Sequence, residues 1–113
     1  MDSQEYINGY IERARKAQAE FEKMSQEEVD KAVQILGKVV YENAQYFAEI
    51  AVEETGMGNV EDKFAKNKQK AGIVWNNLRG KKSRGILDTD EDTGITTVAK
   101  PVGVVAAITP CTN

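Results

Sequence analysis

The stretch Pro101-Val-Gly-Val-Val-Ala-Ala-Ile-Thr-Pro-Cys-Thr-Asn113 decides the fold class. Its centre, Val104–Ile108, is a continuous apolar run, which is typical of a parallel strand covered on both faces in an α/β sheet. Pro110 ends the strand because proline has no N–H for a ladder. The small polar residues that follow then lie beyond the carboxyl end of the strand, where open α/β sheets bind ligands. We therefore expect an α/β protein, and we expect this strand to need neighbours that residues 1–100 do not supply.

The composition excludes several classes of function. The net charge of −3 and the pI near 5.0 argue against a dedicated nucleic-acid binder, which normally carries a basic excess. A single cysteine excludes an internal disulfide and fits a reducing compartment, and the lack of histidine excludes His-based metal or acid–base sites. The sequence shows neither a secretory signal nor an apolar run of ~20 residues. We therefore expect a cytoplasmic protein with no nucleic-acid or membrane partner and no bound metal.

Helical periodicity occupies the first part of the chain. Apolar residues recur at three- and four-residue spacing from Tyr6 to Met24, which predicts one amphipathic helix capped by Asp2 or Ser3. Ser25-Gln-Glu-Glu28 has the pattern of a capping box, so a second helix is expected to begin there.

The second and third helices have their own end signals. The second pattern runs to Gly56 over about thirty residues, longer than the usual ~8–20, so we expect Asn43 to divide it into two helices. A third helix is expected from Asn59 to Gly80. Its buried stripe is predicted to be Val60, Phe64, Ala71, Val74, Trp75 and Leu78.

After Gly80 the pattern changes from helical to extended. Ile86-Leu87 and the β-branched run Ile95–Val98 flank the acidic turn Asp88–Gly94, which predicts a β-hairpin. The predicted organisation is a helical region over 1–80, a hairpin arm over 83–100, and a first strand and turn of a ligand-binding domain over 102–113.

The hairpin turn carries a partial metal-binding pattern. Asp88-x-Asp90-x-Asp92 matches the opening of a calcium loop. Its sixth position, which requires glycine, is Thr93, and its twelfth, which requires a bidentate glutamate, is Ala99. We therefore expect a solvated hairpin tip.

A basic stretch, a single thiol and a glycine near the C-terminus are further candidates for a site. Between Lys63 and Arg84 there are eight Lys or Arg and no acidic residue. Phosphate groups could use this surface, but a solvated helix face is favoured because no aromatic residues are interleaved for base stacking. Cys111 shows no activating base, cation or helix N-terminus, so a small packed side chain near a binding site is favoured over a nucleophile. Gly103 belongs to no G-x-G-x-x-G pattern.

Several strings in the chain resemble the N-terminal part of a CoA-acylating aldehyde dehydrogenase. The resemblance covers essentially the whole sequence and is closest to CoA-dependent succinate-semialdehyde dehydrogenases, with the acetylating acetaldehyde dehydrogenases next. The strings are Gln34-Ile-Leu-Gly-Lys-Val-Val-Tyr-Glu-Asn-Ala44, Ala51-Val-Glu-Glu-Thr-Gly-Met-Gly58, Glu61-Asp-Lys63, Ala71-Gly-Ile-Val-Trp-Asn76 and Gly103-Val-Val-Ala-Ala-Ile-Thr-Pro-Cys-Thr-Asn113.

The resemblance implies a fold, a reaction and a site. The fold is aldehyde dehydrogenase-like, here the N-terminal helices, a hairpin arm and the first strand of the cofactor-binding domain. The reaction oxidises a small-molecule aldehyde to its acyl-CoA with NAD or NADP through a Cys thioester, with coenzyme A as co-substrate and a homo-oligomeric parent enzyme. The residues expected to line the nicotinamide side are Ile108, Thr109, Pro110, Cys111, Thr112 and Asn113.

The resemblance also sets what this chain should lack. The family's catalytic cysteine lies downstream, so no catalytic residue is assigned here, and the 113-residue chain itself is expected to be inactive. Hydrolytic relatives have their oxyanion Asn at the position of Thr112, so that role is not transferred to Asn113. Two alternatives stay open: the acetaldehyde dehydrogenase part of a bifunctional aldehyde-alcohol dehydrogenase, and a free-standing helical protein-interaction module.

Overall fold

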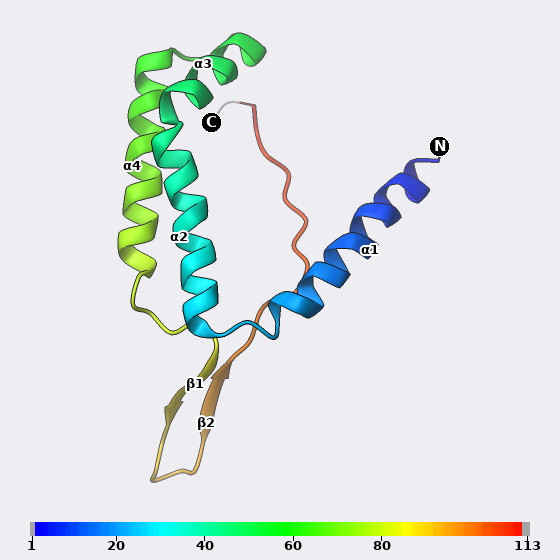
Figure 1. The fold of residues 1–113 in the computed structure, drawn as a ribbon, viewed down its shortest axis with the longest axis vertical. Coiled ribbons are helices and arrows are strands. Elements are labelled where there is room, and N and C mark those ends of the chain that lie inside the picture. The colour runs from blue at the N-terminus through cyan, green and yellow to red at the C-terminus, as the bar shows by residue number, and fades with distance from the viewer. Residues whose placement is uncertain (1, 112–113) are drawn as a thin grey trace. The chain divides into compact units, whose positions relative to one another are not determined.

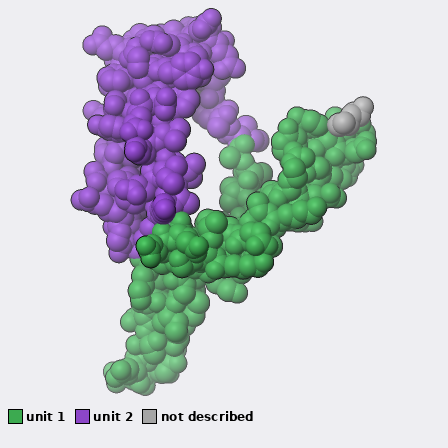
Figure 2. All heavy atoms as spheres, viewed as in Figure 1, with its two compact units in different colours: residues 1–29, 82–107 green, residues 30–81, 108–113 purple. Residues whose placement is uncertain are grey.

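The computed structural model describes residues 2–111, which form four helices followed by one two-stranded sheet (Figure 1). The elements, in chain order, are α1 (Ser3–Phe21), α2 (Gln26–Glu42), α3 (Ala44–Thr55), α4 (Val60–Leu78), β1 (Gly85–Thr89) and β2 (Thr96–Ala99). The chain divides into two compact units, residues 1–29 with 82–107 and residues 30–81 with 108–113 (Figure 2).

The helix starts follow the predicted capping chemistry. Asp2 caps α1, with its carboxylate accepting from the backbone N–H of Gln4 at 3.4 Å. At the start of α2 the Glu28 carboxylate accepts from the N–H of Ser25 at 2.7 Å, and the Ser25 hydroxyl accepts from the N–H of Glu28 at 3.2 Å. Both bonds of the capping box are therefore formed, and they satisfy backbone donors that have no partner inside the helix.

The break between α2 and α3 lies at Asn43, as the sequence predicted, but its side chain does not cap α3. Instead the Asn43 amide donates to the carbonyl of Val39 at 2.8 Å, one turn back in α2. The Asn43 carbonyl still accepts from the N–H of Phe47 at 3.0 Å. The helix is therefore interrupted at one residue whose main chain still participates in the bonding of both segments.

The second unit is organised around the contacting pair of helices α3 and α4. The buried apolar residues of the unit are Ala44 and Ala48, both 0% exposed, and their small side chains allow the helices to approach closely. The Asn67 amide of α4 donates to the carbonyl of Ala44, the first residue of α3, at 3.1 Å, which joins the two helices by a hydrogen bond. The pair is thus held by close packing and by a half-buried polar contact.

The turn between α3 and α4 depends on two glycines. Gly56, at the C-cap of α3, has φ +63°, and Gly58 has φ +72°. Asn59 then caps α4, accepting from the N–H of Asp62 at 2.8 Å and donating to its carboxylate at 2.7 Å. The left-handed backbone favours glycine, so these positions match the predicted helix end and helix start.

The predicted stripe of α4 is only partly buried. Val60, Phe64, Ala71 and Trp75 are half-buried, whereas Val74 and Leu78 stay 52% and 48% exposed. Helical periodicity marks the apolar face of a helix, but burial also requires a partner along its full length.

Among the helices of residues 2–111, none has both the length and the apolarity needed to span a bilayer.

The β-hairpin forms as expected, with β1 and β2 antiparallel. Gly85 pairs with Ala99 and Thr89 with Thr96, and the register shifts between Ile86 and Asp88 in the manner of a β-bulge. The turn is closed by the N–H of Gly94, which donates to the carbonyl of Asp90 at 2.8 Å.

The strand expected over Val104–Ile108 is not formed. Residues 100–110 carry no regular secondary structure, and within the described chain β1 and β2 pair only with each other. A parallel strand requires hydrogen bonds to a neighbouring strand, and the hairpin does not offer one to this segment. Large side chains of residues 102–108 are therefore exposed: Val102 is 90%, Val105 69% and Ile108 100% exposed.

Candidate functional site

The turn predicted to bind a cofactor is exposed. Ile108, Thr109, Pro110 and Cys111 all lie on the surface in an irregular segment, while Thr112 and Asn113 lie outside the described residues. These four described residues include no charged side chain, and three of them, Thr109, Pro110 and Cys111, have short side chains. The described residues do not enclose this turn.

Cys111 differs from the sequence-based expectation. It was expected to be a small packed side chain, but its thiol is exposed. The expectation assumed a strand covered on both faces just before it, and that strand is not formed here. Within residues 2–111 no group of three or more His, Cys, Asp or Glu is arranged to hold a metal ion.

The acidic turn of the hairpin is stabilised by its own hydrogen bonds. The Asp90 carboxylate accepts from the N–H of Asp92 at 2.9 Å and from the N–H of Thr93 at 3.2 Å. The Thr93 hydroxyl, followed by these two N–H groups, lowers the pKa of Asp90. The carboxylate is thus occupied as a turn-forming acceptor, which agrees with the predicted solvated tip.

The basic stretch does not form one continuous cationic face. The Lys68 ammonium lies 3.9 Å from the centre of the Tyr41 ring and 5.8 Å from that of Phe64, so it contacts aromatic faces. Lys63 is 8% exposed, although it belongs to a residue type that is rarely buried. The sequence pattern gave no signal for either placement, because a lysine stem can cover apolar surface wherever the fold provides it.

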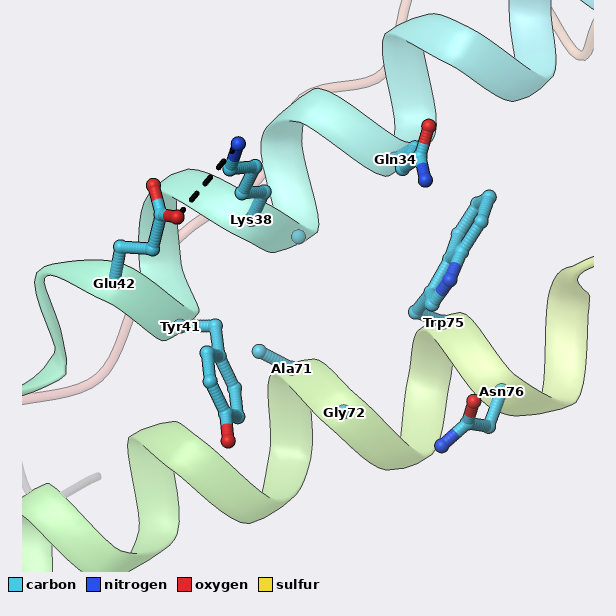
Figure 3. Close-up of a pocket in the computed structure, with 9 residues that line it drawn as sticks. Gln34, Lys38, Tyr41, Glu42, Ala71, Gly72, Trp75 and Asn76 are labelled. Carbon is cyan, nitrogen blue, oxygen red and sulfur yellow. Dashed lines mark ion pairs between the residues drawn. The ribbon is translucent and has the colours of Figure 1, made fainter.

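A groove runs between α2 and α4 within the second unit (Figure 3). It has a volume of about 290 Å³, and the rings of Tyr41 and Trp75 stand toward its two ends. Gly37 lies opposite Trp75, where an added Cβ would be 3.9 Å from the Trp75 Cβ. Lys38 and Glu42 form an exposed ion pair of 3.7 Å along one side. Periodicity alone did not predict this groove, because it arises where glycines leave space between two helices.

A second groove lies in the first unit, between α1 and the segment that follows the hairpin. Its volume is about 590 Å³. On the helix it is lined by Ala14, Ala17, Gln18, Glu20, Phe21 and Met24, and on the other side by Gly103, Val104 and Val105. The apolar stripe of α1 and the apolar run before the predicted turn thus lie next to each other.

Comparisons with known proteins agree on one family. The profile described as "Aldehyde dehydrogenase family" matches residues 1–111. Succinate-semialdehyde dehydrogenase (acetylating) of Clostridium kluyveri is 50% identical over 113 residues, which is 100% of this chain and 25% of that protein. Sulfoacetaldehyde dehydrogenase (acylating) of Bilophila wadsworthia is 47% identical over 109 residues, 95% of this chain and 24% of that protein. The bifunctional aldehyde-alcohol dehydrogenase of Escherichia coli is 36% identical over 107 residues, which is 95% of this chain and 12% of that protein.

Solved structures give the same result for the fold. An acetylating aldehyde dehydrogenase from Geobacillus thermoglucosidasius superposes with a TM-score of 0.75 at 43% identity, covering 78% of this chain and 20% of that one. A probable aldehyde dehydrogenase from Listeria monocytogenes superposes with a TM-score of 0.80 at 33% identity, covering 83% of this chain and 21% of that one. The chain spans about a quarter of the length of the first relatives it matches. With a family match over residues 1–111, the chain belongs to the aldehyde dehydrogenase family.

Proposed function

We propose that this chain contributes to a CoA-acylating aldehyde dehydrogenase that oxidises a short aldehyde carrying an anionic end group. The observation that carries the proposal is the 50% identity to an acetylating succinate-semialdehyde dehydrogenase over all 113 residues. The predicted cofactor turn, residues 108–113, falls within that match. The family model also matches residues 1–111, which favours a part of the enzyme over a free-standing interaction module.

The relatives' substrates favour the anionic class. Relatives named for succinate semialdehyde or sulfoacetaldehyde are 44–50% identical, whereas the bifunctional aldehyde-alcohol dehydrogenases are 36–41% identical. Succinate semialdehyde ends in a carboxylate and sulfoacetaldehyde in a sulfonate, so both place a negative charge a short distance from the reacting carbonyl. Succinate semialdehyde is the preferred candidate, and acetaldehyde is the alternative.

In the proposed enzyme this chain binds and orients rather than reacts. Residues 108–113 would line the nicotinamide side of NAD or NADP, which accepts a hydride when bound. The exposed Thr109 and Cys111 carry short side chains, so the backbone between them can approach a flat ring closely. The nucleophilic cysteine and the CoA contacts would come from outside the chain. We also propose a cytoplasmic location, supported by the single cysteine. A homo-oligomeric parent enzyme is proposed from the family resemblance alone.

A chimeric enzyme tests the proposal. Residues 1–113 would replace the matching quarter of the Clostridium kluyveri relative, and the product would be assayed with succinate semialdehyde, sulfoacetaldehyde and acetaldehyde. We expect NAD(P)H and the acyl-CoA ester to form together, with an anionic aldehyde preferred, while the 113-residue chain alone forms neither. Assembly of a reaction site requires all groups at near-attack distances, and misplacement by ~1 Å can cost ~100-fold.

Two outcomes would contradict parts of the proposal. A folded chimera that forms the acid without the CoA ester would contradict the acylating assignment, and a preference for acetaldehyde would contradict the anionic class. Cys111→Ser in the chimera is expected to retain most of the rate. Loss of the CoA ester on that substitution would show that the nucleophile lies in this chain.

A further inference from the structure

The root of the hairpin arm is joined to the turn between α1 and α2 by polar side chains. All five residues of β1 are exposed, and in β2 only Ala99 is half-buried, so the strands bury little apolar surface that could hold them. Gln26 and Arg84, in contrast, are half-buried and lie at the two ends of this junction. All of these residues belong to the first unit.

Gln26, the first residue of α2, binds the segment that leads into β1. Its side-chain oxygen accepts from the N–H of Ser83 at 2.8 Å and from the N–H of Arg84 at 3.2 Å. Its side-chain nitrogen donates to the Ser83 hydroxyl at 3.0 Å. One amide thus satisfies two consecutive backbone donors that precede the hairpin ladder.

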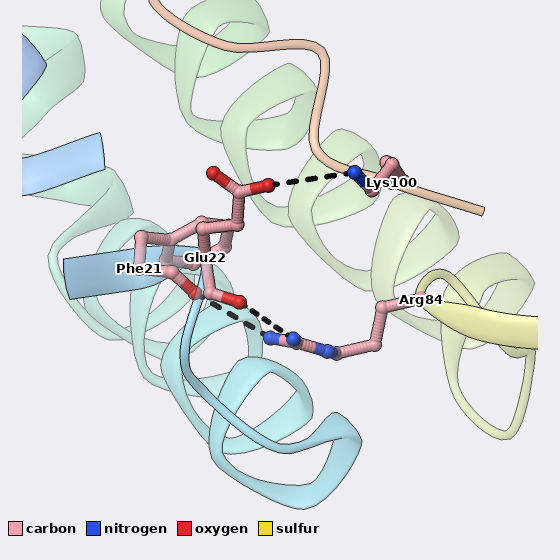
Figure 4. A network of polar contacts seen from close by, with 4 residues as sticks. All are labelled: Phe21, Glu22, Arg84 and Lys100. Carbon is pink, nitrogen blue, oxygen red and sulfur yellow. Dashed lines mark hydrogen bonds and ion pairs between the residues drawn. The ribbon is translucent and has the colours of Figure 1, made fainter. Parts of the chain in front are cut away.

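Arg84 reaches in the opposite direction, to the end of α1 (Figure 4). Its guanidinium donates to the carbonyl of Phe21 at 3.4 Å and to the carbonyl of Glu22 at 2.7 Å. The last carbonyls of a helix have no partner within the helix, and they carry the negative end of its dipole. The Lys100 ammonium lies 3.9 Å from the Glu22 carboxylate, which is a weak contact between exposed groups.

We propose that Gln26 and Arg84 form a reciprocal polar latch that positions the hairpin arm on the α1–α2 turn. The helix side reaches the arm through Gln26, and the arm reaches the helix side through Arg84. Gln26 holds the backbone of Arg84 itself, and Arg84 holds the end of α1 a few residues before Gln26, so loss of either contact is expected to loosen both. Lysine cannot replace Arg84 fully, because the planar fork of guanidinium donors spans two carbonyls at once.

Amide hydrogen exchange of Ser83 and Arg84 in the 113-residue chain reads the latch directly. Gln26→Ala removes the acceptor of both N–H groups, and we expect their exchange to accelerate about tenfold. Gln26→Glu keeps the acceptor oxygen and loses only the donor to Ser83, so both amides should stay protected to within about threefold. Gln34→Ala, an exposed position on the same helix, is the matched control and should leave both rates unchanged.

Reciprocity is tested from the other side. Arg84→Lys leaves Gln26 in place, yet it should also accelerate hydrogen exchange of the Ser83 amide. It should also increase the fast backbone motion of the Gly94 N–H at the hairpin tip. Helical content by circular dichroism shows whether each variant keeps its fold, and Gln26→Glu gives the comparison without loss of the acceptor. Unchanged exchange in Gln26→Ala, or equal acceleration in Gln34→Ala, would overturn the latch. Protection at Ser83 that survives Arg84→Lys would overturn its reciprocity.

Discussion

Alanine substitutions at the two glycines between α3 and α4 separate two costs to the free energy of unfolding. One is backbone strain, and the other is a contact with a buried lysine. Both glycines have positive φ, +63° at Gly56 and +72° at Gly58. A Cβ added at Gly56 would meet no atom within 4 Å, whereas one at Gly58 would lie 3.3 Å from Cε of Lys63. Lys63 is 8% exposed and therefore has little room to move away.

The expected losses follow from this geometry. A left-handed alanine costs about 1–2 kcal/mol, so Gly56→Ala should lower the free energy of unfolding by that amount. Gly58→Ala carries the same strain and an overpacking cost of about 1 kcal/mol, which gives a loss of about 2–3 kcal/mol. In a Lys63→Ala background the contact is absent. Gly58→Ala should then lower the free energy of unfolding only by the amount expected for Gly56→Ala.

Urea unfolding followed by the fluorescence of Trp75 measures these losses. Trp75 is the single tryptophan and lies half-buried on α4, so its emission reports the unit that contains both glycines. Equal losses for the two alanine variants would refute the overpacking argument. A loss from Gly58→Ala that is the same with and without Lys63 would refute the assignment of the contact to that side chain.

Three further predictions concern the caps, the hairpin turn and the exposed apolar run. Asn59→Ala should destabilise α4 by about 1 kcal/mol in the same urea assay, while Asn59→Asp, which keeps the acceptor for the N–H of Asp62, should cost much less. The pKa of Asp90 is lowered in the folded chain, so its contribution to hairpin stability is present above the unfolded pKa of ~3.9 and is lost as the pH falls through the lower folded value. NMR shifts of the turn should show this acid transition in the native chain and not in Asp90→Asn. Val105→Asp with Ile108→Asp should reduce self-association in sedimentation experiments, because 69% and 100% of these apolar residues are exposed.

The helix ends and the hairpin could be predicted because their signals are local. The capping box at Ser25 and the Asn59 cap depend on residues within three positions of each other, and both form as predicted. Asn43 was the right place for the break but not for the expected bond, since its amide turns back to Val39. The capping bonds that begin α2 and α4 were thus correctly predicted from residue spacing and hydrogen-bond chemistry alone.

What could not be predicted depends on partners distant in sequence. The strand over Val104–Ile108 requires a neighbouring strand, and an apolar run cannot show whether one is near. The contacts of Gln26 with Ser83 and Arg84 join residues more than fifty positions apart, and no local pattern indicates them. For the candidate site, the sequence indicated the turn that follows the apolar run, but the exposure of Ile108 to Cys111 depends on long-range partners that no local pattern reveals.

The pairing of α3 with α4 has a consequence for the order of folding. The two helices are adjacent in sequence and are joined by the tight turn 56–59, so bringing them together closes a short loop at low entropic cost. Contacts of low sequence separation form early, whereas the contacts between the α1–α2 turn and residues 83–84 must wait for a much longer loop to close. On a ribosome, residues 44–78 would also leave the exit tunnel before the hairpin arm does. The α3–α4 pair would then form before the contacts at the root of the hairpin arm.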